Sequence, residues 1–120
     1  MHAMALEELE EGLQPGSSAL DIGSGSGYLT ACMAKLVGEQ GKVLGIEYHQ
    51  SLADWGRSNV RYANPEVMDW VKIERGNGWD MSGVPPESFD AIHVGAAASE
   101  IPQELVRVLK RGGVMVIPVG

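Results

Sequence analysis

The sequence predicts an α/β fold, built as a doubly wound and mostly parallel sheet in a single domain over residues 1–120. Helical and strand patterns alternate from end to end, without a linker, low-complexity tract or internal repeat, and this alternation predicts parallel βαβ units. An apolar run at residues 18–22 leads into glycines at 23, 25 and 27, and an amphipathic helical pattern follows directly. The hydrophobic fraction of 44% is enough for a packed core. Ligand sites of such sheets lie at the carboxyl ends of the strands, where the strand order reverses.

The helices are predicted from apolar periodicity and from the residues that break it. The first, over residues 2–13, has leucines on one face and glutamates mostly on the other, and the Gln14-Pro15-Gly16 break follows it. Three further helices are expected at residues 27–37, 51–63 and 102–109. The first of these ends near Gly38, and Asn64-Pro65 stops the next. Gly112-Gly113 is expected to terminate the last helix.

The strands are predicted from short apolar runs bounded by turn residues. They are expected at residues 18–22, 42–47, 71–74, 89–94 and 114–117.

The composition excludes several classes of function. Sixteen acidic against nine basic residues give a net charge of −7, which repels a phosphate backbone and disfavours nucleic acid as a partner. No apolar stretch is long enough to span a membrane, and no secretion signal is recognisable. The single cysteine, Cys32, cannot form an internal disulfide, which fits a reducing compartment and predicts a cytoplasmic location. Cys32 itself is expected to be a small packing residue.

The spacing of the glycines indicates which ligand the turn accepts. Glycines permit positive φ and close approach of a ligand, and the following helix directs free N–H groups at the turn. A dinucleotide fingerprint needs its third glycine at position 28, where this chain has Tyr28, so a dehydrogenase is excluded. The compact Gly23-Ser24-Gly25-Ser26-Gly27 pattern with Asp21 ahead of it resembles the first motif of class I methyltransferases, which bind S-adenosylmethionine (SAM).

Two further strand ends carry candidate cofactor-binding residues. Glu47 ends the second strand about 20 residues after the glycines, where an acid binds a ribose diol. The alternative is a solvated acid at a strand end. Tyr48 could flank an adenine ring. Asn77, in Gly76-Asn77-Gly78, can present its carbonyl oxygen to the adenine amine, as this loop does in methyltransferases, or can form a simple Asn-Gly turn.

The fourth strand ends in small residues that would leave room for a sulfonium centre and an acceptor. His93 lies inside this strand and is expected to be a packed or hydrogen-bonded core histidine rather than a catalytic one. Asp90 is expected to fix the entrance of the strand. The three histidines have no spacing typical of a metal site, and no metal is expected.

Over essentially its whole length the chain resembles protein-L-isoaspartate O-methyltransferases. The matching segments are Met1-His2-Ala3, 20–31, 41–43, Asn59-Val60, 90–97, 109–113 and 117–120, and residues 90–97 are the most specific. The resemblance implies a SAM-dependent repair enzyme that methylates the α-carboxylate of L-isoaspartyl residues in damaged proteins. It places Gly23, Ser24, Gly25 and Gly27 at the methionine part of SAM, Glu47 at the ribose, Asn77 and Gly78 at the adenine, and His2 near the cofactor.

The chain departs from this family in two ways. Asn77 stands where the family usually has aspartate. The family is also longer at both ends: a serine ahead of its Met-His contacts the acceptor, and further strands follow Pro-Val-Gly to complete a seven-stranded sheet. We therefore expect a partial core of about five strands, in which the catalytic residues are unknown because the acceptor-site serine is expected upstream. We also expect an exposed apolar edge at residues 114–117 that favours self-association or partial disorder. An inactive SAM-binding fragment and another small class I methyltransferase are the alternatives.

Overall fold

The computed structural model describes residues 2–95 and 102–117, with side chains from Leu6 onward. Its centre is a five-stranded sheet in the order β3-β2-β1-β4-β5, and every neighbouring pair is parallel. The strands are β1 (Ser18–Ile22), β2 (Lys42–Glu47), β3 (Val71–Arg75), β4 (Phe89–Val94) and β5 (Leu109–Val116). The strand order reverses between β1 and β4, so the predicted doubly wound fold is confirmed and its switch point lies at their carboxyl ends.

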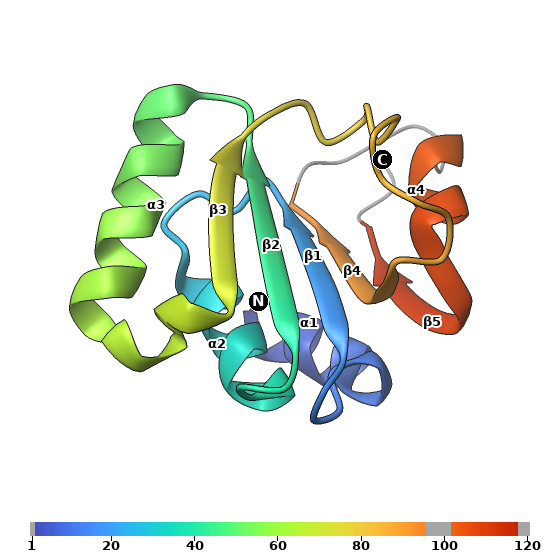
Figure 1. Cartoon of the computed structure of the whole chain (residues 1–120), viewed down its shortest axis with the longest axis horizontal. Coiled ribbons are helices and arrows are strands. Elements are labelled where there is room, and N and C mark those ends of the chain that lie inside the picture. The colour runs from blue at the N-terminus through green and yellow to red at the C-terminus, as the bar shows by residue number, and fades with distance from the viewer. Residues whose placement is uncertain (1, 96–101, 118–120) are drawn as a thin grey trace.

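Helices cover both faces of this sheet (Figure 1). They are α1 (His2–Leu9), α2 (Tyr28–Val37), α3 (Gln50–Ala63) and α4 (Gln103–Val108), with 3₁₀ turns η1 (Glu10–Gly12) and η2 (Pro65–Asp69). One core contains Leu9 and the buried residues of α2 and α3, packed on β1, β2 and β3. A second core, on the opposite face, joins α4 to β1 and β4 through Leu20, Ile92 and Leu105, which are fully buried.

Three of the five predicted strands have the bounds expected from the sequence, and β3 is one residue longer. One helix boundary and one strand boundary were wrong. The first helix changes to a 3₁₀ turn after Leu9 rather than continuing to residue 13. The fourth helix ends at Val108, one residue before its predicted end, but β5 begins at once with Leu109 in extended conformation rather than at the predicted residue 114.

The glycines expected to stop the fourth helix instead lie inside β5. Leu109 pairs with Phe89 and Val114 pairs with Ala91, so the residues between them form an irregularity in the ladder. Gly112 has a φ of 81° there, a conformation that glycine adopts without strain. The register of β5 against β4, which the local sequence pattern does not contain, decides where the helix ends.

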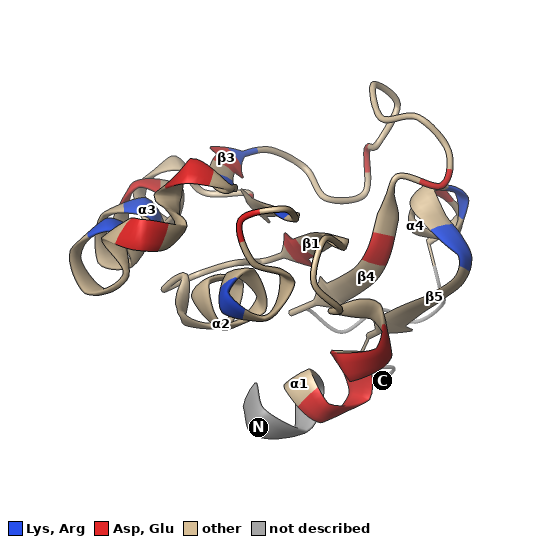
Figure 2. Cartoon of the chain, turned by 60° about the horizontal axis from the view of Figure 1, so that its bottom comes forward, with Lys and Arg blue, Asp and Glu red and all other residues tan. Residues whose placement is uncertain are grey.

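The position of β5 at one edge of the sheet and the acidic residues of α1 agree with the sequence-based predictions. β5 pairs only with β4 among the described strands, as expected of an edge strand, while self-association through it stays a prediction. In Figure 2 the ribbon is red, the colour of acidic residues, over part of α1 and the turn after it. In the part of the chain that the structure describes, no helix is long and apolar enough to cross a bilayer, and no three metal-ligating side chains come together.

Candidate functional site

The three glycines after β1 form a tight turn at the switch point of the sheet. Gly23, Gly25 and Gly27 have φ values of 78°, 50° and 84°, all in the region that L side chains rarely adopt. The Gly23 N–H donates to the Ile46 carbonyl of β2 at 2.8 Å. At the end of β4, the Gly95 N–H donates to the Ile22 carbonyl, also at 2.8 Å. The turn therefore lies between the carboxyl ends of β2 and β4, and Gly27 leads into α2.

Helix α3 packs against the far side of this turn. A Cβ on Gly27 would lie 2.7 Å from Val60 Cγ2, and a Cβ on Gly56 would lie 2.5 Å from the Gly25 carbonyl oxygen. Asn59 Nδ2 donates to the Ser26 carbonyl at 3.1 Å. Sequence reasoning did not assign these α3 residues to the site, although a glycine inside a helical pattern is a signal for close packing.

Glu47 points back into the glycine turn. Its side chain accepts a hydrogen bond from the Gly25 N–H at 3.0 Å through Oε1, and from the His49 N–H at 3.4 Å through Oε2. Glu47 is only 8% exposed, so the alternative of a solvated strand-end acid was wrong. Tyr48, in contrast, is 62% exposed and contacts His49 edge-to-face, with ring centroids 5.3 Å apart. Its proposed place beside adenine stays a prediction.

Ser24 holds a polar atom that the described part of the chain leaves without a partner. Its Oγ is buried and makes no hydrogen bond, while the residue as a whole is 7% exposed. Buried hydroxyls are nearly always hydrogen-bonded, so an unpaired one needs an explanation. Because Ser24 lies in the glycine turn, a polar group of a bound ligand would satisfy it.

The loop after β3 joins the same edge of the sheet. The Gly76 N–H donates to the Glu47 carbonyl at 2.9 Å, which fixes the start of the loop beside the end of β2. Asn77 is exposed, and its Oδ1 accepts from the Trp79 N–H at 3.0 Å, so the Asn-Gly turn is confirmed. Gly78 is buried, and a Cβ there would collide with the side chain of Ile22. The turn does not exclude the adenine role of Asn77, which stays a prediction.

Beneath the turn, a buried hydrogen-bond network joins β1, α2 and β4. Asp21 is 1% exposed, and its carboxylate accepts from Thr30 Oγ1 at 2.7 Å and from His93 Nδ1 at 3.0 Å. A carboxylate only accepts, so this contact places a proton on Nδ1 of His93. The prediction of a hydrogen-bonded core histidine is confirmed.

The entrance of β4 is fixed as expected. Asp90 Oδ2 accepts from the Ser18 N–H at 2.8 Å and from Lys110 Nζ at 3.2 Å.

Some predicted features lie outside the described part of the chain. The side chain of His2 is one of them, and residues 96–98 of the small-residue run are another.

Cys32 is partly buried on α2, and its hydrogen bond with Tyr28 raises the pKa of that phenol above its ordinary value.

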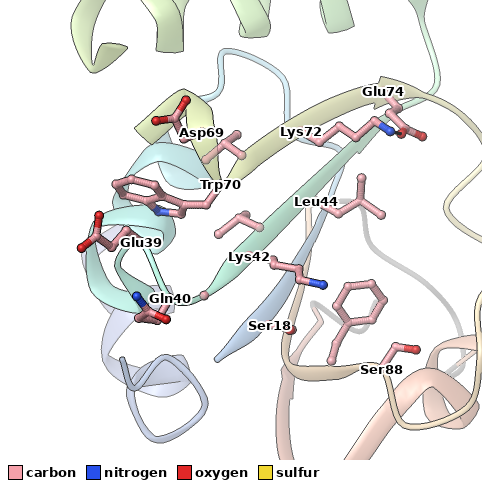
Figure 3. Close-up of a pocket in the computed structure, with 14 residues that line it drawn as sticks. Ser18, Glu39, Gln40, Lys42, Leu44, Asp69, Trp70, Lys72, Glu74 and Ser88 are labelled. Carbon is pink, nitrogen blue, oxygen red and sulfur yellow. Dashed lines mark ion pairs between the residues drawn. The ribbon is translucent and has the colours of Figure 1, made fainter. Parts of the chain in front are cut away.

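A hollow on the other side of the molecule does not belong to this site. It has a volume of about 810 Å³, and residues of β2 and β3 line it together with Ser18 at the start of β1 (Figure 3). Lys42, Leu44 and Phe89 contribute to its lining, and Lys72 pairs with Glu74 at 2.9 Å along one side. None of the predicted cofactor residues between Gly23 and Gly78 lines it.

The sheet order, the glycine turn at the switch point and the acid at the end of β2 define a class of protein. This is the Rossmann-like fold of SAM-dependent methyltransferases. Within that class, the family model described as protein-L-isoaspartate(D-aspartate) O-methyltransferase matches residues 1–120. The chain therefore belongs to the protein-L-isoaspartate O-methyltransferase family.

Individual relatives agree with this assignment. The chain is 50% identical over 122 residues to a protein-L-isoaspartate O-methyltransferase of Triticum aestivum, covering 100% of this chain and 53% of the relative. The chain is 44% identical over 125 residues to the protein-L-isoaspartate O-methyltransferase of Caenorhabditis elegans, and the match covers 99% of this chain and 53% of that relative. A Plasmodium falciparum structure named for the same activity, in complex with S-adenosyl-L-homocysteine, superposes with a TM-score of 0.90 at 39% identity, covering 100% of this chain and 59% of that one. The chain thus spans about half the length of the curated relatives it matches.

Proposed function

We propose that this chain is the cofactor-binding core of an enzyme that methylates L-isoaspartyl residues in damaged proteins, with SAM as methyl donor. The observation that carries the proposal is the glycine turn that Glu47 and α3 hold at the switch point. Family membership over residues 1–120 supports the same activity. We also propose that residues 1–120 form a single domain.

The residues present fit such a cofactor. Gly23 and Gly25 have no Cβ, which permits their positive φ and lets a ligand approach the backbone of the turn closely. The unpaired Oγ of Ser24 would meet a polar group of the methionine part. Glu47 would accept from the ribose hydroxyls, and the loop of Asn77 and Gly78 would face the adenine.

The chemistry that the cofactor supplies is an electrophilic methyl group on a sulfonium. An isoaspartyl α-carboxylate is already ionised near neutral pH, so the protein needs no strong general base. Its residues would act by fixing the acceptor oxygen in line with the methyl group and by excluding water. This agrees with the absence of a catalytic dyad among the described residues of the site. Normal aspartate would be regained when the methyl ester closes to a succinimide and reopens.

The acceptor side, the location and the assembly of the protein are also proposals. In the family, a serine ahead of the Met-His segment contacts the acceptor, and we propose that acceptor binding needs residues beyond those of this chain. We further propose a cytoplasmic location, which the lone Cys32 supports, and self-association along the β5 edge. The second candidate function is SAM binding without turnover, which the glycine turn and Glu47 would by themselves support.

Two assays separate these functions. Titration calorimetry with SAM and S-adenosylhomocysteine measures cofactor binding, and transfer of labelled methyl to an isoaspartyl peptide and to its aspartyl twin measures activity. Transfer to the isoaspartyl peptide alone supports the repair function. Binding without transfer supports the second candidate, and equal transfer to both peptides refutes the repair function.

The ribose assignment has its own test in the same calorimetric assay. Glu47→Ala should weaken SAM binding by about 1–3 kcal/mol, the scale for losing hydrogen bonds to a charged group. Glu74→Ala is the matched control, because it removes an acid near the end of the neighbouring strand that pairs with Lys72 instead. Unchanged affinity in Glu47→Ala, or an equal loss in Glu74→Ala, would contradict the assignment.

A further inference from the structure

Asn77 differs from the other asparagines of the chain in the residue next to it. The chain has three asparagines, at positions 59, 64 and 77, and only Asn77 precedes a glycine; no aspartate does. A glycine offers a backbone nitrogen with no side chain to hinder its attack on the preceding side chain. The sequence alone thus identifies one place where an asparagine can cyclise onto its own backbone.

The structure exposes the Asn77 side chain and leaves the nitrogen of the buried Gly78 without a hydrogen-bond partner among the described residues. The Trp79 N–H donates to Oδ1 of Asn77 at 3.0 Å, so it polarises the amide carbonyl. The same N–H would stabilise the negative charge that develops on this oxygen when a nucleophile adds to Cγ.

The other two asparagines lack this arrangement. Asn59 lies inside α3, its side chain donates to the Ser26 carbonyl, and the β-branched Val60 follows it. Asn64 precedes Pro65, whose nitrogen carries no hydrogen to lose. They serve as internal controls within the same chain.

We propose that Asn77 is a site of spontaneous deamidation, which converts the loop after β3 into aspartyl and isoaspartyl forms. The Gly78 nitrogen loses its proton to solvent and forms a bond to Cγ of Asn77. The Cγ–Nδ2 bond then breaks, and Nδ2 takes up a proton and leaves as ammonia. Water opens the resulting five-membered succinimide at either carbonyl, so one product is aspartate and the other has the main chain running through the side-chain carboxyl carbon.

The two products change the loop differently. Aspartate at position 77 retains an oxygen that accepts from the Trp79 N–H, so the turn persists with one added negative charge, and the residue becomes the one that the family usually has there. The isoaspartyl form lengthens the main chain by a methylene between residue 77 and Gly78. Gly78 packs against Ile22 with no room even for a Cβ, so the isoaspartyl loop has to move away from β1.

The consequence for the cofactor rests on the proposed function, whereas the chemical step does not. If this loop faces adenine, the isoaspartyl form should bind SAM more weakly than the unmodified chain. The experiment on the modification therefore contains no SAM, so its failure and a failure of the proposed function are distinguishable.

The test is peptide mapping by mass spectrometry after the folded chain has been incubated at mildly alkaline pH. We expect the peptide containing Asn77 to gain the mass difference between an amide and an acid, with release of one equivalent of ammonia. We also expect it to elute as separate aspartyl and isoaspartyl forms, while Asn59 and Asn64 stay unchanged. Asn77→Gln is the control variant, because its longer side chain would have to close a six-membered ring, and it should gain no mass at this position.

Two outcomes at Asn77 and one at Asn64 would overturn the proposal. One is an intact Asn77 in the folded chain under conditions that convert it in the urea-unfolded chain, which would mean that the fold protects the loop. The other is formation of the aspartyl product alone, which would indicate direct hydrolysis rather than a succinimide. A mass gain that appears equally at Asn64 would also contradict it, because Pro65 cannot supply the attacking nitrogen.

Discussion

Four glycine-to-alanine substitutions separate the two reasons why the turn at the switch point needs glycine. Gly27 has a φ of 84°, and an added Cβ would lie 2.7 Å from Val60 Cγ2. Gly16 has a φ of 89° but nothing within 4 Å of an added Cβ. Gly56 has ordinary helical φ, while its Cβ would lie 2.5 Å from a backbone oxygen. Gly83 has neither feature.

The expected free energies of unfolding are set by these contacts. Gly83→Ala should change stability by less than about 1 kcal/mol, since it only reduces the entropy of the unfolded chain. Gly16→Ala should cost about 1–2 kcal/mol for left-handed backbone strain. Gly56→Ala gains about 1 kcal/mol of helix propensity but overpacks a rigid backbone, which costs about 1–3 kcal/mol. Gly27→Ala combines strain and contact, so it should cost about 2–5 kcal/mol.

Urea unfolding followed by circular dichroism measures these differences, and the midpoint shift at constant m-value gives each change in stability. The reasoning depends on the order of the four variants more than on any single value. If Gly27→Ala costs no more than Gly16→Ala, the packing of α3 against the turn does not contribute. If Gly56→Ala is more stable than the parent chain, the glycine turn can move away from α3. The close approach of the two segments would then not require a glycine at position 56.

Two further predictions concern hydrogen bonds around the site. Asp21→Ala should destabilise the chain by about 2–5 kcal/mol, because the buried Thr30 hydroxyl and the His93 imidazole both lose their partner; thermal unfolding measures this. Hydrogen bonds from Ser82 lower the pKa of Asp80. Because the folded-state pKa lies below the unfolded one, this stabilisation is present above the unfolded pKa and is lost as the pH falls through the folded pKa. Ser82→Ala should raise the pKa of Asp80 in an NMR titration.

Each of these has an outcome that contradicts it. Thr30→Val removes one of the two partners and should cost less than Asp21→Ala, so the reverse order would show that the network does not act as described. An unchanged Asp80 titration in Ser82→Ala would mean that the backbone N–H of residue 82 alone accounts for the lowered pKa.

Local sequence predicted the elements that local chemistry controls. The bounds of β1, β2 and β4 reflect apolar runs closed by turn residues, and α3 ends where Asn64-Pro65 stops it. The positive φ values at Gly23, Gly25 and Gly27 agree with their spacing. These features depend on residues adjacent in the chain, and the sequence shows them directly.

The start of β5 shows where that reasoning fails. Gly112-Gly113 is a sound stop signal for a helix, but β5 starts before it because Leu109 pairs with Phe89 of β4. Asp21 and His93, 72 residues apart, meet only because β4 returns beside β1. The close packing of Gly56 on the glycine turn likewise requires the crossing of α3 over it.

By itself, therefore, the sequence determined the fold class, the glycine turn and the family it resembles, because each depends on short-range patterns. The tertiary structure decided that Glu47 is buried against Gly25, that Ser24 holds an unpaired hydroxyl, and that the Gly78 nitrogen is free of hydrogen bonds from the described residues beside an exposed Asn77. These facts depend on contacts between strand ends that lie far apart in the chain. Only the assembled sheet brings those ends together.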